Sequence, residues 1–121
     1  MEWDYGEYEG LRPDDILEKR PGWTIWKDGV PGGETAEQVG ERAKKVIMMA
    51  DTTEGDVAVF SHGHLLKILA ACWLTLPPDG GRYFDLATAS ISVLGYHGDD
   101  SIIRKWNHAP ILFAQPTNVP G

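Results

Sequence analysis

The sequence predicts an α/β protein in which helices pack on a mixed sheet. Three observations predict this class: a capped amphipathic stretch over residues 35–50, an apolar run at 57–60 that leads directly into a helical pattern, and an alternating segment at 90–106 that a turn interrupts. A helix, a strand, a helix and a hairpin in this order are typical of α/β domains. The 121 residues suit one domain of ordinary size.

The N-terminal third is expected to be largely irregular. Residues 1–10 are rich in glycine, acidic and aromatic residues, which favours a loop. Pro13 can open a short helix that keeps Ile16 and Leu17 on its inner side and ends before the Pro-Gly pair at 21–22. An aromatic segment, WTIWKDG, then leads into a loop of proline and glycine.

The first long helix begins at Thr35. The letters TAEQ match a capping box, in which the Thr35 hydroxyl and the Gln38 side chain each accept from the other's backbone N–H. Small and branched apolar residues recur at helical spacing and predict one buried stripe: Val39, Ala43, Val46, Ile47 and Ala50. A turn is expected at 52–55.

The run from Val57 to Phe60 is apolar with little alternation, which suits a strand buried on both faces of a parallel sheet. From His64 to Leu74 the pattern becomes helical, and the letters PPDGG stop it. The sequence therefore predicts a strand that passes directly into a helix through the letters SHGH.

The C-terminal part predicts a hairpin. Residues 90–97 alternate, Gly-Asp-Asp at 98–100 is a turn, and 102–106 can return as the second strand. Three prolines in residues 110–121 indicate a loosely ordered tail. No internal repeat or low-complexity tract is present.

Composition excludes several classes of function. Hydrophobic residues are 42% and charged residues 24%, as in soluble globular proteins. The net charge of −7 and the lack of a basic stripe argue against a nucleic-acid partner. One cysteine, Cys72, leaves no internal disulfide or multi-cysteine metal site. The most apolar stretch, 64–76, is too short to span a membrane, and no leader pattern is seen, so a cytoplasmic protein is expected.

The SHGH junction is the first candidate site, because open α/β sheets bind ligands at the carboxyl ends of their strands. The helix that follows offers free backbone N–H groups and the positive end of its dipole. His62 could hold a phosphate, and Gly63 would let a bound group approach the backbone closely. The alternative is that His62 is a hydrogen-bonded core histidine, and that His64 starts the helix with only its backbone N–H facing the site.

The second candidate is the segment EWDYGEYEG. A carboxylic acid beside an aromatic wall can have a raised pKa and act as a general acid. The alternative is an acidic surface loop.

Together these motifs resemble the histidine phosphatase superfamily, in its phosphoglycerate mutase-like branch. EWDYGEYEG is similar to the segment with the acidic proton donor, with Glu2 at that position, and PGGET at 31–35 is similar to the family's Gly-Gly-Glu-Ser/Thr motif. VAVFSHGHLLKIL resembles the strand, second catalytic histidine and helix, with His62 as that histidine, and TASISVLGY resembles the C-terminal end. The aromatic WDYGEYEG and WTIWKDG segments look most like the acid phosphatase and sugar-bisphosphatase members.

The resemblance implies a three-layer α/β/α fold with a mixed, mostly parallel sheet that is incomplete at its N-terminal part, so that residues 1–121 form a single partial domain. It also implies metal-free, cofactor-free hydrolysis of small phosphate monoesters such as sugar phosphates through a phosphohistidine. Glu2 and His62 would be catalytic, and His62, Gly63 and His64 would bind phosphate. Trp23 and Trp26 would line the substrate mouth or pack in a core or lid.

One departure from the family pattern concerns the nucleophile, which is the histidine of an Arg-His-Gly motif. In this sequence His-Gly occurs at residues 62 and 97, and neither follows arginine. His64, His97 and His108 are not convincing substitutes. We therefore expect a C-terminal portion of a phosphatase that lacks the nucleophile, is inactive alone, and leaves Val57 to Phe60 without its partner strand.

Three interpretations follow from the sequence. The first is this inactive portion of a phosphatase, whose partner is a small phosphorylated metabolite, with a second copy of the chain as a further candidate. The second is a non-catalytic module that binds an anion or regulates through the same fold. The third is a plain α/β domain in which SHGH is structural.

Overall fold

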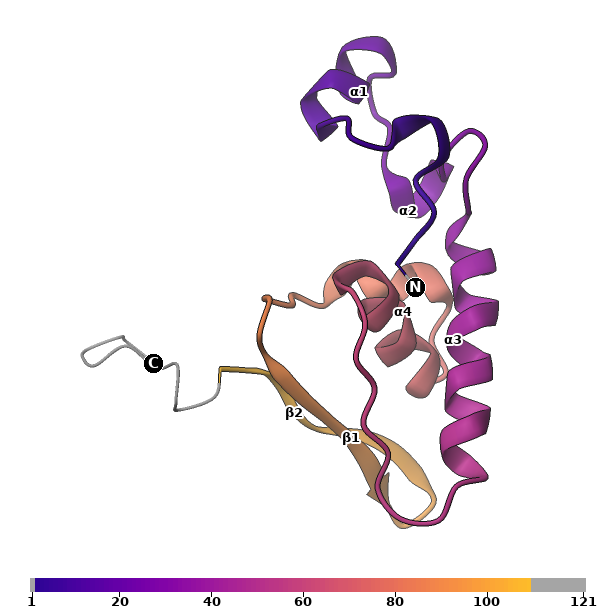
Figure 1. Ribbon diagram of the computed structural model, residues 1–121, viewed down its shortest axis with the longest axis vertical. Helices are drawn as coiled ribbons and strands as arrows, with labels where there is room; N and C mark the ends of the chain where they lie inside the picture. The colour runs from indigo at the N-terminus through magenta and orange to yellow at the C-terminus, as the bar shows by residue number, and fades with distance from the viewer. Residues whose placement is uncertain (1, 110–121) are drawn as a thin grey trace, which may run out of the picture.

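A computed structural model describes residues 2–109 of the chain (Figure 1). The predicted tail, 110–121, lies outside the described residues. The elements follow in chain order: η1 (Gly6–Tyr8), α1 (Pro13–Lys19), α2 (Ile25–Asp28), α3 (Ala36–Asp51), α4 (Gly63–Trp73), η2 (Pro78–Tyr83), β1 (Ile91–His97) and β2 (Asp100–His108).

The predicted capping box of α3 is confirmed. The Thr35 hydroxyl accepts from the Gln38 N–H at 3.3 Å, and the Gln38 side chain accepts from the Thr35 N–H at 2.9 Å. These bonds satisfy backbone donors that the first turn of a helix leaves without partners. Val39 and Ala43, which lead the predicted stripe, are fully buried.

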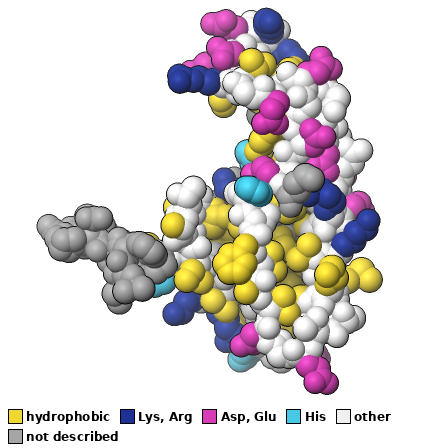
Figure 2. All heavy atoms as spheres, viewed as in Figure 1, with side chains coloured by type: hydrophobic (Ala, Val, Ile, Leu, Met, Phe, Trp, Pro, Cys, Tyr) yellow, Lys and Arg dark blue, Asp and Glu magenta, His cyan; other side chains and the backbone are white. Residues whose placement is uncertain are grey.

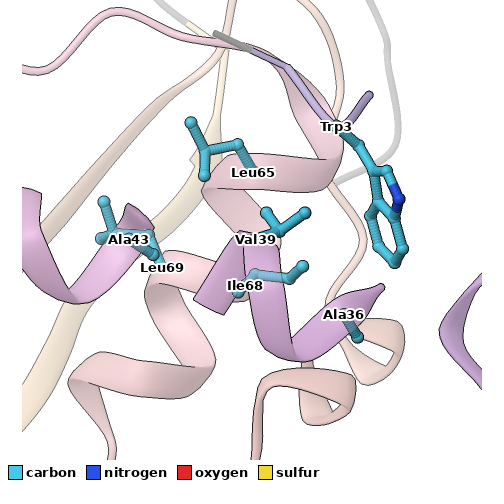
Figure 3. Close-up of a cluster of buried hydrophobic side chains, with 7 residues drawn as sticks. All are labelled: Trp3, Ala36, Val39, Ala43, Leu65, Ile68 and Leu69. Carbon is cyan, nitrogen blue, oxygen red and sulfur yellow. The ribbon is translucent and has the colours of Figure 1, made fainter. Parts of the chain in front are cut away.

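The core lies where α3 packs against α4, and Figure 1 shows the two helices side by side. Ile68 of α4 is fully buried against this face. Figure 3 shows the cluster, which also contains a residue from the N-terminal segment: Trp3, Ala36, Val39, Ala43, Leu65, Ile68 and Leu69. Burial of such side chains, at about 25 cal/mol per Å² of apolar surface, is the main source of stability here.

The predicted hairpin is confirmed. β1 pairs with β2 in antiparallel register, and His97 lies opposite Asp100 at the turn. Among the contacts that hold the hairpin to the helices, the Trp73 indole N–H donates to the Ile102 carbonyl at 3.0 Å, and the Tyr96 hydroxyl donates to Asp51 at 2.8 Å. The hairpin is the only sheet among residues 2–109, so the described part is α/β with an antiparallel pair.

The buried strand predicted at 57–60 is not observed. This segment is extended, but it forms no ladder with any strand among residues 2–109. Val57 and Val59 are 46% and 42% exposed, and Phe60 is 94% exposed. Apolar side chains gather on the lower half of the face that Figure 2 shows. A strand needs a neighbour with which to exchange hydrogen bonds, and the sequence-based expectation of an unpaired, exposed segment therefore holds.

The N-terminal third differs from expectation in three details. Trp3, in the predicted loop, is 2% exposed and belongs to the core. Leu17 of α1 is 39% exposed, whereas Ile16 is buried, so only Ile16 faces inward. The WTIWKDG segment contains a helical turn, α2, which Thr24 caps by accepting from the Lys27 N–H at 3.2 Å. Among residues 2–109 no helix is long and apolar enough to cross a bilayer.

Candidate active site at the start of α4

The Glu2 carboxylate lies at the N-terminus of α4. Its oxygens accept from the backbone N–H of His64 at 3.1 Å and from that of Leu65 at 2.9 Å, and also from the Trp3 N–H at 2.9 Å. These two helix N–H groups have no partner within the helix, and the helix dipole adds a partial positive charge there. The structure thus brings together the two motifs that the sequence separates by about 60 residues.

The pKa of Glu2 is lowered, not raised as the aromatic surroundings suggested. Burial by itself raises the pKa of this carboxyl group, but backbone hydrogen bonds from Trp3, Leu65 and His64 together outweigh it. These donors favour the charged form. In this state Glu2 is a bound anion, and the helix terminus is the site that binds it.

The PGGET motif holds the Glu2 segment in place. A Cβ atom added at Gly33 would lie 2.3 Å from the Asp4 carbonyl oxygen and 2.8 Å from the Gly6 nitrogen. The two segments therefore touch through their backbones, and only glycine fits. The Glu34 N–H donates to the Asp4 carbonyl at 3.0 Å, and the Glu7 N–H donates to the Pro31 carbonyl at 2.9 Å.

Glu34 and Arg42 complete this support. The Arg42 guanidinium donates to both Glu34 carboxylate oxygens, at 2.7 and 2.9 Å, and to the Glu2 carbonyl at 2.9 Å. Glu34 also accepts from the Asp4 N–H at 2.8 Å, and its own carbonyl accepts from the Trp3 indole N–H at 2.8 Å. Hydrogen bonding to Arg42 is the main cause of the lowered pKa of Glu34. Arg42 therefore bonds to both segments: to the Glu34 carboxylate of the PGGET motif and to the Glu2 carbonyl of the N-terminal segment.

His64 contributes more than its backbone. Its Nδ1 is 2.7 Å from the Tyr5 hydroxyl, and its ring makes edge contacts with Trp3, Tyr5 and Trp26. Burial lowers the pKa of His64, Glu2 opposes this effect, and Lys67 adds to it. The same burial, together with the Glu2 charge, raises the pKa of Tyr5 to about 12. His64 is therefore a neutral aromatic wall at neutral pH, although Nδ1 is only 3.9 Å from a Glu2 oxygen.

His62 is the N-cap residue of α4, and its side chain is exposed and makes no capping bond. Exposure excludes the alternative of a hydrogen-bonded core histidine. A Cβ atom added at Gly63 would meet nothing within 4 Å, so the space beside the helix terminus is open. Within residues 2–109 no group of three or more acidic, histidine or cysteine side chains is arranged to hold a metal ion.

A cavity of about 340 Å³ adjoins this site and shares His64 as one wall. Tyr5, Tyr8 and Trp23 form other walls, and a place for Trp23 at a substrate mouth stays a prediction. Trp26 instead packs against Trp3 and His64. Sequence reasoning missed Tyr5 and Arg42. Glu34 precedes α3, so no helical spacing in the sequence pairs it with Arg42.

Comparison with known proteins identifies relatives of this arrangement. A model of the "Histidine phosphatase superfamily (branch 1)" matches residues 1–109. The chain is 41% identical over 100 residues to an acid phosphatase of Mycobacterium tuberculosis, which covers 80% of this chain and 49% of that protein. It is 38% identical over 92 residues to sedoheptulose 1,7-bisphosphatase of Saccharomyces cerevisiae, and this match covers 62% of this chain and 34% of that protein. The chain therefore spans about half of one curated relative and about a third of the other.

Solved structures agree with the sequence relatives. The structure of an open reading frame from Mycobacterium tuberculosis matches with a TM-score of 0.84 and 35% identity, over 89% of this chain and 57% of that one. The α-ribazole phosphatase of Shigella flexneri matches in fold, with a TM-score of 0.72 at 18% identity, over 91% of this chain and 59% of that one. The predicted α/β fold class agrees with these matches. The chain belongs to the histidine phosphatase superfamily, branch 1.

Proposed function

We propose that this chain is the C-terminal part of a metal-independent hydrolase of small phosphate monoesters. Glu2 is the proton donor, His62 is the second histidine, and the start of α4 at Gly63 and His64 binds the phosphoryl group. The nucleophilic histidine lies outside these 121 residues, and the chain alone is inactive. The family, and relatives named as phosphatases, support this proposal.

One observation carries the proposal: the Glu2 carboxylate accepts from the N–H groups of His64 and Leu65, which have no partner within the helix and follow shortly after His62. A phosphoryl oxygen makes the same kind of bond to a helix N-terminus as a carboxylate oxygen does. Gly63 leaves the approach open, and the exposed His62 can add an imidazole N–H donor. The terminus therefore offers anion-binding N–H groups beside an exposed histidine.

The same geometry explains how Glu2 could become an acid. A phosphoryl group that takes the two helix N–H groups displaces the carboxylate from donors that lower its pKa. The negative charge of the phosphoryl group raises that pKa further. Glu2 would then carry a proton when substrate is bound, whereas it is charged in the empty site.

The chemistry follows from these positions. The nucleophilic histidine nitrogen bonds to phosphorus, the ester P–O bond breaks, and Glu2 gives its proton to the leaving oxygen. Water then adds to phosphorus, the P–N bond breaks, and the water proton returns to Glu2. Side-chain cations and the helix terminus balance the phosphoryl charge without a metal.

The exposed segment at 57–60 supports an incomplete domain, because its valines and Phe60 lie where a neighbouring strand could pair. We infer that the rest of the domain covers this face in the complete protein. A second copy of the chain, a cytoplasmic location and sugar phosphates as substrates stay predictions.

The experiment is phosphate protection against thermal unfolding. Phosphate at about 100 times its Kd should stabilise the chain by about 2.7 kcal/mol, and His62→Ala should abolish the shift without loss of the fold. His97→Ala, at an exposed histidine on β1, is the matched control and should keep the shift. Unchanged protection in His62→Ala would overturn the assignment.

The second candidate is the non-catalytic anion-binding module. The absence of Arg-His-Gly from the sequence favours it. Both candidates predict phosphate binding at His62, and phosphoenzyme formation by the complete protein distinguishes them.

A further inference from the structure

The cavity beside the anion site has walls that are mainly aromatic and aliphatic. The lining residues that form these walls include Tyr5, Tyr8, Leu11, Trp23 and Ile25. His64 links the two places, because its ring lines the cavity while its backbone N–H donates to Glu2. A phosphoryl group at the helix terminus would therefore lie next to a residue of the cavity wall.

Three polar groups of the aromatic walls already have hydrogen-bond partners within the protein. The Tyr5 hydroxyl bonds His64 Nδ1 at 2.7 Å, the Tyr8 hydroxyl accepts from Arg20 at 3.2 Å, and the Trp23 indole N–H donates to the Gly29 carbonyl at 3.0 Å. The rings consequently present carbon surfaces to the cavity. Against these carbon surfaces the hydroxyl groups of a sugar would lose water without gaining a hydrogen-bond partner, which is unfavourable.

The charges of the lining residues also favour an uncharged group. No lysine or arginine among residues 2–109 lines the cavity, and Glu9 contributes a carboxylate to it. Arg20 contacts Tyr8 but is not itself part of the lining. A second phosphate on the substrate would meet this carboxylate and no lining cation, so the cavity suits an uncharged group.

We propose that this cavity binds the organic part of the phosphate monoester and selects aromatic or apolar groups over polyhydroxylated sugars. The inference rests on the proposed function for its orientation, since the phosphoryl group must lie at the start of α4. It narrows the substrate to aryl or alkyl phosphates, and it departs from the sugar phosphates that the resemblance implies.

The test uses indole N–H signals in NMR spectra of the 121-residue chain. Trp23 lines the cavity. Trp73 and Trp106 serve as internal references, because the Trp73 indole N–H donates to a carbonyl of the hairpin and the Trp106 indole N–H donates to the Asp85 carbonyl. The probes are 1-naphthyl phosphate, 1-naphthol, glucose 6-phosphate and inorganic phosphate. We expect the two naphthyl compounds to shift Trp23 selectively, and naphthyl phosphate to bind about tenfold or more tightly than glucose 6-phosphate.

Two variants locate the binding. Leu11→Asp places a carboxylate in the wall at a side chain that is already 49% exposed, so the fold should tolerate it. Leu17→Asp is the matched control, at a leucine that is 39% exposed and outside the lining. Naphthyl phosphate should bind about tenfold more weakly to Leu11→Asp and unchanged to Leu17→Asp.

The outcomes separate the cavity from the proposed function. Equal affinity for glucose 6-phosphate, no selective Trp23 shift, or equal weakening by both variants would overturn the inference. Inorganic phosphate tests the function alone, through the backbone N–H signals of His64 and Leu65. If 1-naphthol shifts Trp23 but phosphate leaves those signals unchanged, the ligand class of the cavity is supported and the phosphatase site is refuted.

Discussion

Gly33→Ala tests the contact that places Glu2 at α4. The added Cβ would lie 2.3 Å from the Asp4 carbonyl oxygen and 2.8 Å from the Gly6 nitrogen, both of them backbone atoms that cannot rotate away. Ordinary contacts of a Cβ atom begin near 3.4 Å, so the two segments must separate by about 1 Å. Gly33 itself has no positive φ, so the effect comes from space and not from backbone conformation.

The magnitude follows from the bonds that this separation breaks. The Glu34 N–H bond to the Asp4 carbonyl (3.0 Å) and the Asp4 N–H bond to the Glu34 carboxylate (2.8 Å) both cross the contact. Two such bonds at about 1 kcal/mol each, with about 1–2 kcal/mol of steric strain, give a loss of about 3 kcal/mol in the free energy of unfolding. For a chain of this length the corresponding fall in Tm is about 10 °C.

Thermal and urea unfolding measure this loss, and Gly63→Ala is the control. An added Cβ at Gly63 meets nothing within 4 Å and its φ is not positive, so its stability should stay within about 0.5 kcal/mol of wild type. If Gly33→Ala is as stable as wild type, or both variants lose equally, the backbone contact does not hold the Glu2 segment.

Three further predictions concern the same region. Glu34→Gln removes the two-oxygen pairing with Arg42 and should lower the free energy of unfolding by about 1–2 kcal/mol in urea titrations; no change would mean that the pair is fully screened. Because the pKa of His64 is lowered, the unfolded chain takes up a proton at higher pH than the folded chain, so Tm should fall as the pH drops below about 6.5. His64→Gln should flatten this fall, and an unaltered slope of Tm against pH would contradict the role of His64. Ile68→Ala, at a fully buried site, should cost about 2–5 kcal/mol in urea, whereas Met48→Ala, at a residue 66% exposed, should cost under about 0.5; equal costs would refute the core assignment.

Elements with local signals could be predicted from the sequence. The helix at Thr35 has its cap and its apolar stripe within one segment, and the hairpin has its turn between two alternating runs. The SHGH junction could also be placed, because an apolar run leads there directly into a helical pattern. For these elements a window of about 15 residues contains the deciding information.

Features that depend on distant partners could not be predicted in the same way. The apolar run at 57–60 has the composition of a buried strand, yet only a neighbouring strand could make it one. Trp3 lies among acids and glycines, and its burial follows from the Glu34 carbonyl, which accepts its indole N–H. The lowered pKa of Glu2 could not be anticipated from its own segment, because two of its three backbone donors, the N–H groups of His64 and Leu65, lie about 60 residues away.

Sequence motifs identified Glu2 and the SHGH junction. The structure brings them into contact, because Glu2 accepts from the backbone N–H groups of His64 and Leu65. Their roles as acid and second histidine stay predictions. Tyr5 and Arg42 had no motif of their own, because each acts through a contact that only the folded chain makes: Tyr5 with His64, and Arg42 with the Glu2 carbonyl.

The most direct test of the central claim is hydrolysis of p-nitrophenyl phosphate from acidic to neutral pH, without metal and with chelator. The 121-residue chain is assayed beside a version extended upstream in the source DNA until Arg-His-Gly appears. We predict hydrolysis by the extended version, its loss in the extended His62→Ala variant, and none by the shorter chain. Hydrolysis by the 121-residue chain that His62→Ala abolishes would contradict the account, because another residue would then accept the phosphoryl group.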